Sequence, residues 1–274
     1  MNTRFSFSVL AVLLVGLFGC VGSDMKINSF EAMGGKTVGV VSVGAVAKQQ
    51  ASLVKRYINA DPREIIEYSR RSDAIMALLS GKADGIACPS FVAEYYAKRN
   101  NLLKVVTAKE EIPYKVIMVV RKENEALRND LNKAIGLLNE SGRLKSLEND
   151  WITNLPLTGE PANIGKMNSA SARVLRVGVS GDFPPLDYIS ADGRPAGFNV
   201  ALMSEIGTQL DIRFEFVSLE SSARFTALAS GKIDVIFFHF KSEQAPDLFD
   251  FDASKWITTD PYFQYLGDYF LVKK

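Results

Sequence analysis

Few side chains in this sequence have the types and spacing that catalysis or metal binding requires. The chain of 274 residues contains one histidine, His239, and two cysteines, Cys20 and Cys88. A serine nucleophile such as Ser42 would need His239 as its base and an orienting carboxylate, and nothing local in the sequence supports that arrangement. Metal chemistry lacks ligands for the same reason. We therefore expect no catalytic residue, no metal and no cofactor, and we expect binding rather than turnover.

The residues best suited to binding follow predicted strands. In "GDFPP", Asp182 and Phe183 come directly after an apolar stretch that Gly181 breaks. Because ligands of parallel α/β sheets bind at the carboxyl ends of the strands, we expect both side chains to line a cleft. A second apolar stretch ends in Phe238, His239, Phe240 and Lys241. A lone histidine is as often a satisfied hydrogen-bonding residue as a ligand contact.

The first residues predict a lipoprotein signal. Arg4 precedes an apolar run, 9–18, that is too short for a stable transmembrane span. The "LFGC" that follows resembles the lipobox of bacterial lipoproteins, in which the cysteine thiol carries the lipid. Ordinary cleavage with loss of Cys20 is the alternative. We expect lipidation at Cys20, and hence an extracytoplasmic protein (periplasm or cell surface) anchored to the lipid membrane.

Composition excludes other classes. Net charge is +1 and no basic run is present, so nothing favours a nucleic-acid partner. The hydrophobic fraction of 47% is that of a globular protein with a substantial core. Once Cys20 is lipidated, Cys88 has no partner for an intramolecular disulfide.

One sequence motif occurs twice in the remaining chain. "ALLSGKADGIA" (77–87) and "ALASGKIDVIF" (227–237) each indicate a helix end, a glycine and the start of a buried strand. We expect Gly81 and Gly231 to end the helices in the left-handed conformation. Both halves of the chain show strands alternating with helices around this phrase. This pattern predicts an α/β fold with mostly parallel sheets.

Two further expectations concern polar residues of the repeated unit. Ser72 or Asp73 is expected to cap the N-terminus of the first helix. Asp84 and Asp234, which follow the Gly-Lys pair in each copy, are expected to form local hydrogen bonds at the strand start rather than to act as catalysts.

Longer motifs resemble a known family. "LRVGVSGDFPPLDY", "GRPAGFNVALMSEI" and "ALASGKIDVIFF" are similar to the first part of extracellular solute-binding protein family three, the type II periplasmic binding proteins of amino-acid importers. "GKTVGVVSVG" and "AIMALLSGKADGIA" are similar to its second part. The resemblance implies a two-lobed fold, in which two hinge strands join lobes built from a mixed, mostly parallel sheet flanked by helices.

The order of the two parts is reversed relative to the family, which we interpret as a circular permutation. The alternative is a remnant of two tandem binding proteins whose halves complete each other by domain swapping. The expected parts are a signal and tether (1–24), a lobe corresponding to the family's second lobe (36–114), a discontinuous lobe corresponding to its first (115–152 and 174–265), a linker joining the family's original termini (153–173) and two hinge strands (114–122 and 265–274).

The resemblance also implies a binding site but not the family's anchors. The positions of the arginine and the aspartate that hold an amino acid in the family fall on Pro246 and Pro89. We therefore expect weak binding of ordinary free amino acids. The expected ligand-binding residues are Asp182, Phe183, Tyr188, Phe198, Ser221, Phe238, His239, Phe240, Lys241, Ser42, Gly44, Ala45 and Ser90.

The expected function is capture of a small organic ligand, amino-acid-like or another small polar or anionic compound, between the lobes. An ABC importer would receive the ligand. Two alternatives stay open: a ligand-sensing module for a membrane receptor, and a dehydratase-like enzyme on the same fold.

Overall fold

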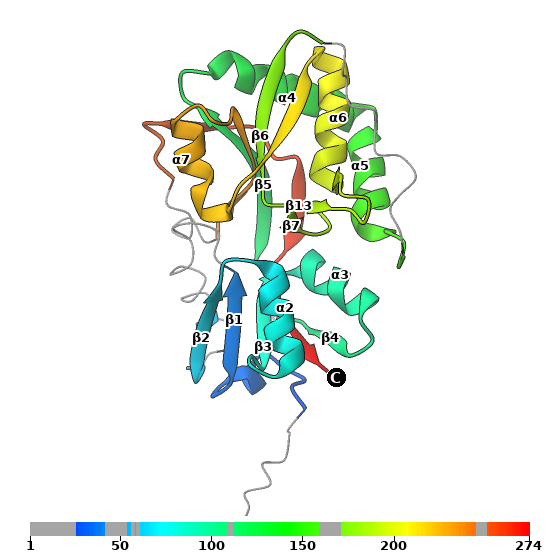
Figure 1. Cartoon of the computed structure of the whole chain (residues 1–274), viewed down its shortest axis with the longest axis vertical. Helices are drawn as coiled ribbons and strands as arrows, with labels where there is room; N and C mark the ends of the chain where they lie inside the picture. Colours follow the sequence, from blue (N-terminus) through cyan, green and yellow to red (C-terminus); the bar gives the residue numbers. More distant parts are fainter. Residues whose placement is uncertain are drawn as a thin grey trace, which may run out of the picture.

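Two lobes, one above the other in Figure 1, make up the molecule, and each has its own central sheet. The structure is a computed structural model that describes residues 26–41, 54–55, 58, 61–108, 112–158, 171–244 and 251–274. The predicted signal, the predicted lipidation site Cys20 and most of the predicted linker lie outside these residues. In the described part of the chain, no helix combines the length and apolarity needed to cross a membrane.

The smaller lobe contains a five-stranded sheet in the order β2-β1-β3-β14-β4. Strands β1, β2 and β3 are parallel, and β14 runs antiparallel to β3 and β4. Its elements are η1 (Glu31–Met33), β1 (Thr37–Val41), β2 (Glu64–Tyr68), α2 (Arg71–Ser80), β3 (Gly85–Pro89), α3 (Ser90–Arg99), β4 (Leu103–Val106) and β14 (Asp268–Lys273).

The larger lobe contains a sheet in the order β10-β6-β11-β5-β12, and β13 also pairs with β5. A small sheet, β7-β8-β9, lies beside it. The strands are β5 (Pro113–Arg121), β6 (Val174–Val179), β7 (Asp182–Phe183), β8 (Asp187–Ile189), β9 (Pro195–Ala196), β10 (Arg213–Ser218), β11 (Val235–Lys241), β12 (Trp256–Thr258) and β13 (Phe263–Leu266). The helices are α4 (Glu125–Glu140), α5 (Arg143–Glu148), η3 (Asn149–Thr153), α6 (Phe198–Leu210), η4 (Ser221–Ala223) and α7 (Arg224–Ala229).

Both sheets have the same internal order. The first, second and third strands are β1, β2 and β3 in the smaller lobe and β6, β10 and β11 in the larger lobe. In each sheet the first strand lies between the other two, and the strand beside the third comes from the other half of the chain. The third strands, β3 and β11, are nearly all buried, as expected for strands covered on both faces. The predicted α/β fold with mostly parallel sheets is confirmed.

The repeated sequence forms the same connection between a helix and a strand in both lobes. The Asp84 carboxylate accepts a hydrogen bond from the Thr37 N–H at 2.8 Å, and the Asp234 carboxylate accepts one from the Arg176 N–H at 2.9 Å. Each aspartate thus fastens the third strand to the first. Gly81 and Gly231 have φ of 79° and 72°, so the left-handed helix ends and the local role of the aspartates are confirmed.

The predicted cap of α2 is wrong. Helix α2 begins at Arg71, so Ser72 and Asp73 lie inside its first turn, and the N-cap residue Arg70 forms no side-chain cap. The free N–H groups of this turn instead meet a carboxylate from the larger lobe, which is described below.

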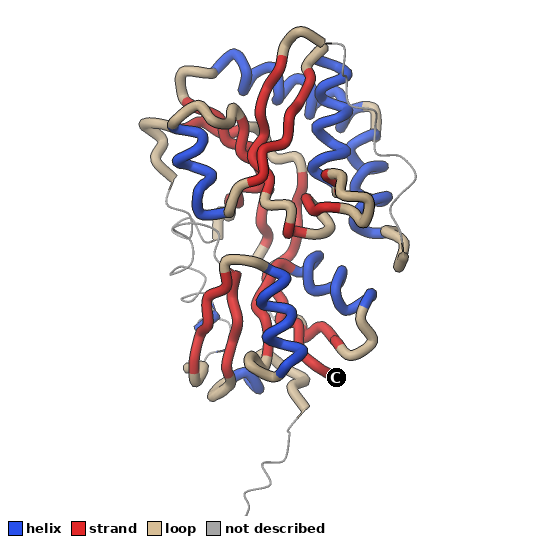
Figure 2. The backbone as a smooth tube through the Cα atoms, in the orientation of Figure 1, coloured by secondary structure: helices blue, strands red, loops and turns tan. Residues whose placement is uncertain are grey.

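The chain passes between the lobes at two neighbouring places, before β5 and after β13 (Figure 2). There β5 and β13 pair antiparallel, with Tyr114 opposite Tyr265 and their rings stacked at 5.1 Å. The Gly267 N–H donates to the Ile112 carbonyl at 2.8 Å, which ties the two crossings together. Since one crossing continues into β14 and the other into β5, each crossing completes one sheet.

A glycine fixes the small sheet against α6. Gly197 has φ of 114°, and a Cβ added there would overlap the carbonyl oxygen of Leu186. The chain on either side is held by hydrogen bonds from the Phe198 and Asn199 N–H groups to the carbonyls of Pro185 and Leu186.

We predict that Gly197→Ala lowers the free energy of unfolding by more than about 3 kcal/mol, because a backbone clash adds to the cost of a positive φ. The matched control is Gly193→Ala, whose φ is 80° but which faces open space. It should cost only about 1 kcal/mol. Urea denaturation measures both, and equal losses would contradict the packing argument.

Candidate functional site

A pocket of about 350 Å³ lies between the two lobes. It is formed where strands end: β1 and β2 of the smaller lobe face β6 and β10 of the larger lobe. Ligands of open α/β sheets bind at this edge. The lining residues are Val41, Ser69, Arg70, Arg71, Ser180, Asp182, Phe183, Ser218, Leu219, Glu220, Ser221, Arg224 and Phe238.

Arg71, the first residue of α2, forms one wall of the pocket. Its side chain is 5% exposed, and its guanidinium carbon lies 4.4 Å from the centre of the Phe183 ring, which belongs to the larger lobe. Its Nε is buried and has no hydrogen-bond partner among the described residues. Leaving such a group unpaired costs about 1–3 kcal/mol. A bound anion would compensate a guanidinium in this situation.

Arg224, the first residue of α7, lies on the opposite wall. It is 8% exposed, its Nε donates to the Ser221 carbonyl at 3.2 Å, and its Nη1 donates to the Phe237 and Phe238 carbonyls at 3.0 and 3.2 Å. Burial lowers its pKa and the negative charge of Asp187 raises it. Each lobe therefore contributes one nearly buried arginine to the pocket.

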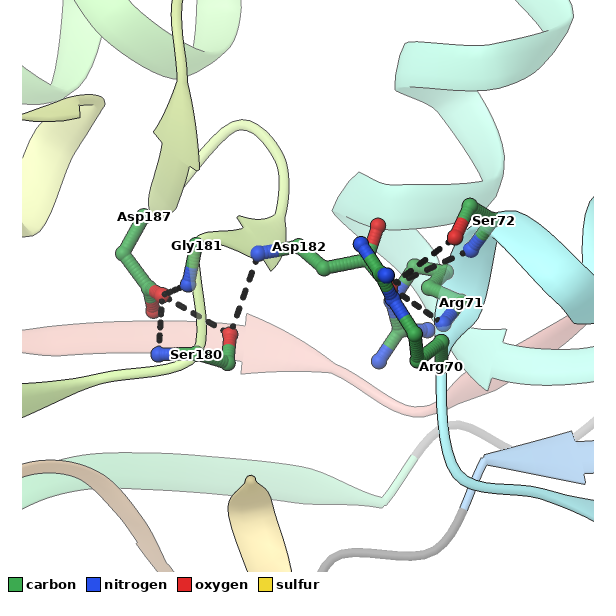
Figure 3. Close-up of polar contacts among 7 residues, drawn as sticks. All are labelled: Arg70, Arg71, Ser72, Ser180, Gly181, Asp182 and Asp187. Carbon is green, nitrogen blue, oxygen red and sulfur yellow. Dashed lines mark hydrogen bonds and ion pairs between the residues drawn. The ribbon is translucent and has the colours of Figure 1, made fainter. Parts of the chain in front are cut away.

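Asp182 joins the two lobes beside Arg71 (Figure 3). One oxygen of its carboxylate, Oδ2, accepts hydrogen bonds from the Arg71 N–H at 2.6 Å and the Ser72 N–H at 3.2 Å. The Ser72 hydroxyl lies 3.4 Å from the same oxygen, and Nε of Arg70 lies 4.0 Å away. The carboxylate thus takes the position of a helix cap for α2, although it belongs to the other lobe.

The loop that holds Asp182 is ordered from within the larger lobe. Oδ1 of the buried Asp187 accepts hydrogen bonds from the Ser180 N–H, the Ser180 hydroxyl and the Gly181 N–H at 2.8–3.0 Å. Oγ of Ser180 in turn accepts one from the Asp182 N–H at 3.3 Å (Figure 3). Burial raises the pKa of Asp187 to about 6, and these hydrogen bonds and the Arg224 charge oppose the rise.

Four of the predicted ligand-binding residues line this pocket: Asp182, Phe183, Ser221 and Phe238. Phe183 lines it although it is only 7% exposed, because its ring lies between Arg71 and the Phe238 ring. Ser42, Gly44 and Ala45 lie outside the described residues.

Other predicted residues lie elsewhere. Phe198, predicted as a ligand-binding residue, is a core residue with no exposed surface, packed on Tyr262 and Phe263, and does not line the pocket. Ser90 is buried at the start of α3, where its N–H donates to the Gly267 carbonyl. Tyr188 is half-buried, and its ring lies 6.4 Å from that of Tyr95, in the opposite lobe.

His239, Phe240 and Lys241 line a different cavity, of about 340 Å³, within the larger lobe. The His239 ring lies between Phe225 and Phe251, at 5.6 and 5.7 Å. Burial lowers the pKa of His239 to about 4, and the charge of Arg224 adds to the effect. His239 is therefore neutral at pH 7 and is not positioned to bind a ligand in the pocket between the lobes.

Sequence reasoning missed the arginines of the pocket. Arg70 and Arg71 stand in "SRRSD", between the end of β2 and the start of α2, and Arg224 stands in "SSAR" at the start of α7. Each site is the junction of a strand end and a helix start, where ligands of α/β folds bind. Arginine at these junctions was the signal that could have found them.

The raised pKa of Asp187 predicts a pH dependence of stability. Because the folded protein holds this proton more tightly than the unfolded chain, the resulting stability is present below about pH 4 and is lost as the pH rises through about 6. The Asp187→Asn variant cannot ionise, so wild type should lose stability relative to it across this range. The lowered pKa of His239 makes stability rise with pH instead. Because this contribution is the same in wild type and Asp187→Asn, it cancels from the difference in stability between them.

The measurement is urea denaturation of wild type and Asp187→Asn at pH 4, 5, 6 and 7. The matched control is Asp192→Asn in the same lobe, since Asp192 is exposed and its pKa is lowered to about 2. A difference between wild type and Asp187→Asn that stays constant over this range would contradict the argument.

Comparison with known proteins identifies part of the chain. The sequence profile of the bacterial extracellular solute-binding proteins, family 3, matches residues 175–274. An amino-acid ABC transporter-binding protein assigned in Vibrio harveyi, PatH, is 33% identical over 92 residues, which are 34% of this chain. The match spans about a third (34%) of that relative's own length.

Solved structures show a remote likeness. The ligand-binding component of an ABC-type import system from Staphylococcus aureus matches with a TM-score of 0.42 and 12% identity, over 87% of this chain and 65% of that one. The periplasmic VFT2 domain of BvgS from Bordetella pertussis matches with a TM-score of 0.39 and 12% identity, over 87% and 78%. The sequence match is limited to residues 175–274, where this chain is similar to the bacterial extracellular solute-binding proteins of family 3.

Proposed function

We propose that this protein captures a small acidic solute between its two lobes and that the closed form is delivered to an ABC importer. The observation that carries the proposal is the pocket between the lobes, in which each lobe contributes one nearly buried arginine. A ligand that contacts both walls binds the closed form better than the open form, and so it shifts the equilibrium toward closure.

The chemistry of the pocket favours a ligand with a carboxylate or another small anionic group. Nε of Arg71 has no hydrogen-bond partner in the described part of the chain, and the hydrogen bonds that Arg224 donates there go to uncharged carbonyls. Guanidinium groups bind carboxylates through two parallel hydrogen bonds. Neutral amino acids should bind weakly, because Pro89, which ends β3, stands where the family has its aspartate.

Partner and location follow from the family match and the first residues of the sequence. Solute-binding proteins of this family act outside the cytoplasm, and the relative in Vibrio harveyi is assigned to an amino-acid ABC transporter. We therefore propose an extracytoplasmic protein tethered to the membrane through Cys20, with an importer permease as its partner. A membrane receptor that senses the closed form is the second candidate partner.

We also propose that the chain is a circular permutation of the family's fold. The described N-terminal segment packs on β14 near the C-terminus, with the rings of Phe30 and Phe270 4.6 Å apart. Residues on both sides of the 159–170 gap belong to the larger lobe. This arrangement supports a permutation because the described ends of the present chain pack close together, and the residues that flank 159–170 belong to one lobe.

The first test is a thermal-shift screen with dicarboxylic acids, keto acids, acidic amino acids, neutral amino acids and sugars. A ligand at 100 times its Kd should add about 2.7 kcal/mol of stability and raise Tm by a few degrees. We expect shifts with acids and none with neutral amino acids. Sub-micromolar binding of a neutral amino acid, or binding of sugars alone, would contradict the proposed ligand class.

Replacing one arginine tests the site itself. Arg71→Gln should weaken binding of the tightest acid by at least about tenfold, since a hydrogen bond to a charged group contributes about 1.5–3 kcal/mol. Arg194→Gln is the matched control, because Arg194 is exposed and pairs with Asp192 outside the pocket. Calorimetric titration measures both, and equal affinities for the two variants would place the ligand elsewhere.

Moving the chain ends tests the permutation. A chain that begins at Ser171, continues from Lys274 into Lys26 through a short Gly-Ser linker and ends at Thr158 restores the family's order. We expect it to fold as a monomer with a Tm within about 5 °C of wild type, since the packed elements are unchanged. Failure to fold, or a strand-exchanged dimer for the wild-type chain, would favour the tandem-remnant alternative.

A further inference from the structure

We propose that Asp182 is an internal latch: its carboxylate holds the two lobes closed in the absence of a ligand by capping helix α2 of the opposite lobe. The first turn of any helix has N–H groups without partners inside the helix, and a nearby side chain usually accepts from them. Among the described residues of the helix's own lobe, no side chain does so for α2. The acceptor is 110 residues away in the sequence.

The geometry of the contact is that of a charged cap. Oδ2 of Asp182 receives the N–H groups of Arg71 and Ser72, and the Asp182 side chain is 19% exposed. A carboxylate at a helix N-terminus interacts favourably with the helix dipole as well as with the N–H groups. When the lobes separate, the hydrogen bonds between these N–H groups and the carboxylate break. The interaction therefore stabilises only the closed form.

The loop that carries Asp182 is ordered by contacts within its own lobe. Asp187, Ser180 and Gly181 belong to the same lobe as Asp182, and their hydrogen bonds fix the loop whether the lobes are open or closed. Little conformational freedom of the loop is therefore lost when the cap forms. The stacking of Arg71 on Phe183 adds a second contact between the lobes at the same place.

The latch has a consequence for how a ligand is held. The N-terminus of α2 would attract an anion, but the protein's own carboxylate already occupies it. A bound acid is then left with the side chains of the pocket, Arg71 and Arg224, rather than with the N–H groups of α2.

The test uses ligand-free protein and two readouts. Hydrogen exchange reports the Arg71 and Ser72 amides, and small-angle scattering reports the radius of gyration, which increases when the lobes separate. The variants are Asp182→Asn, which keeps the shape of the side chain but loses its charge, and Asp182→Ala. The matched control is Asp192→Asn, in the same lobe, whose carboxylate pairs with Ser190 and Arg194 only in its own lobe.

We expect wild type and the control to have the radius of gyration of the closed structure. In Asp182→Ala the ratio of closed to open molecules should fall about tenfold, with a larger radius and faster exchange at both amides. Asp182→Asn should lie between them. Because Asp182→Asn changes so little volume, it keeps the test usable if Asp182→Ala does not fold.

Two results would overturn the latch. One is a wild-type protein that is already open without ligand. The other is faster amide exchange in folded Asp182→Asn and Asp182→Ala with an unchanged radius of gyration, which would make Asp182 a local cap that does not control closure. Either result leaves the proposed capture of a solute standing, because that proposal depends on the ligand screen and on Arg71→Gln.

Discussion

The exchange of one strand between the two halves of the chain is the constraint on which the rest of the structure depends. The sheet of the smaller lobe contains β14 from the end of the chain between β3 and β4, and the sheet of the larger lobe contains β5 from the first half between β11 and β12. Neither lobe can complete its sheet from one continuous segment. Both sheets therefore depend on the two crossings, and the pairing of β5 with β13 holds the crossings side by side.

This constraint also determines where the pocket lies. Because the two crossings are neighbours, the strand ends of both sheets face each other across the pocket between the lobes. The residues that meet there lie at or just after the ends of β1, β2, β6 and β10 and at the starts of α2 and α7. Their contacts differ. Asp182 joins the lobes, and Asp187 holds the loop that carries Asp182. Nε of Arg71 has no hydrogen-bond partner among the described residues, and Arg224 donates to carbonyls of its own lobe.

Much of the fold could be predicted from local sequence. The repeated Gly-Lys-x-Asp phrase marks helix ends and strand starts because a left-handed glycine and an aspartate bound to the adjacent strand are local requirements, and both copies satisfy them. Phe183 could be predicted as a pocket residue from its place after a strand.

The contacts between the lobes could not be predicted in the same way. Ser72 and Asp73 looked like caps because a cap is normally local, whereas the acceptor for α2 comes from the other lobe. Phe198 and His239 were expected in the cleft. Phe198 of α6 instead packs on Tyr262 and His239 of β11 packs on Phe251, so both side chains lie inside the larger lobe. Which side chains face a cleft depends on how two lobes meet, and periodicity within one element carries no information about that.

The central claim is that an acid binds between the two arginines of opposite lobes. A crystal structure of the protein with the tightest acid from the screen tests it most directly. The account predicts the acid group within hydrogen-bond distance of the guanidinium groups of Arg71 and Arg224, with Asp182 still bound to α2. An acid found instead in the cavity beside His239, with the pocket between the lobes occupied only by water, would contradict it.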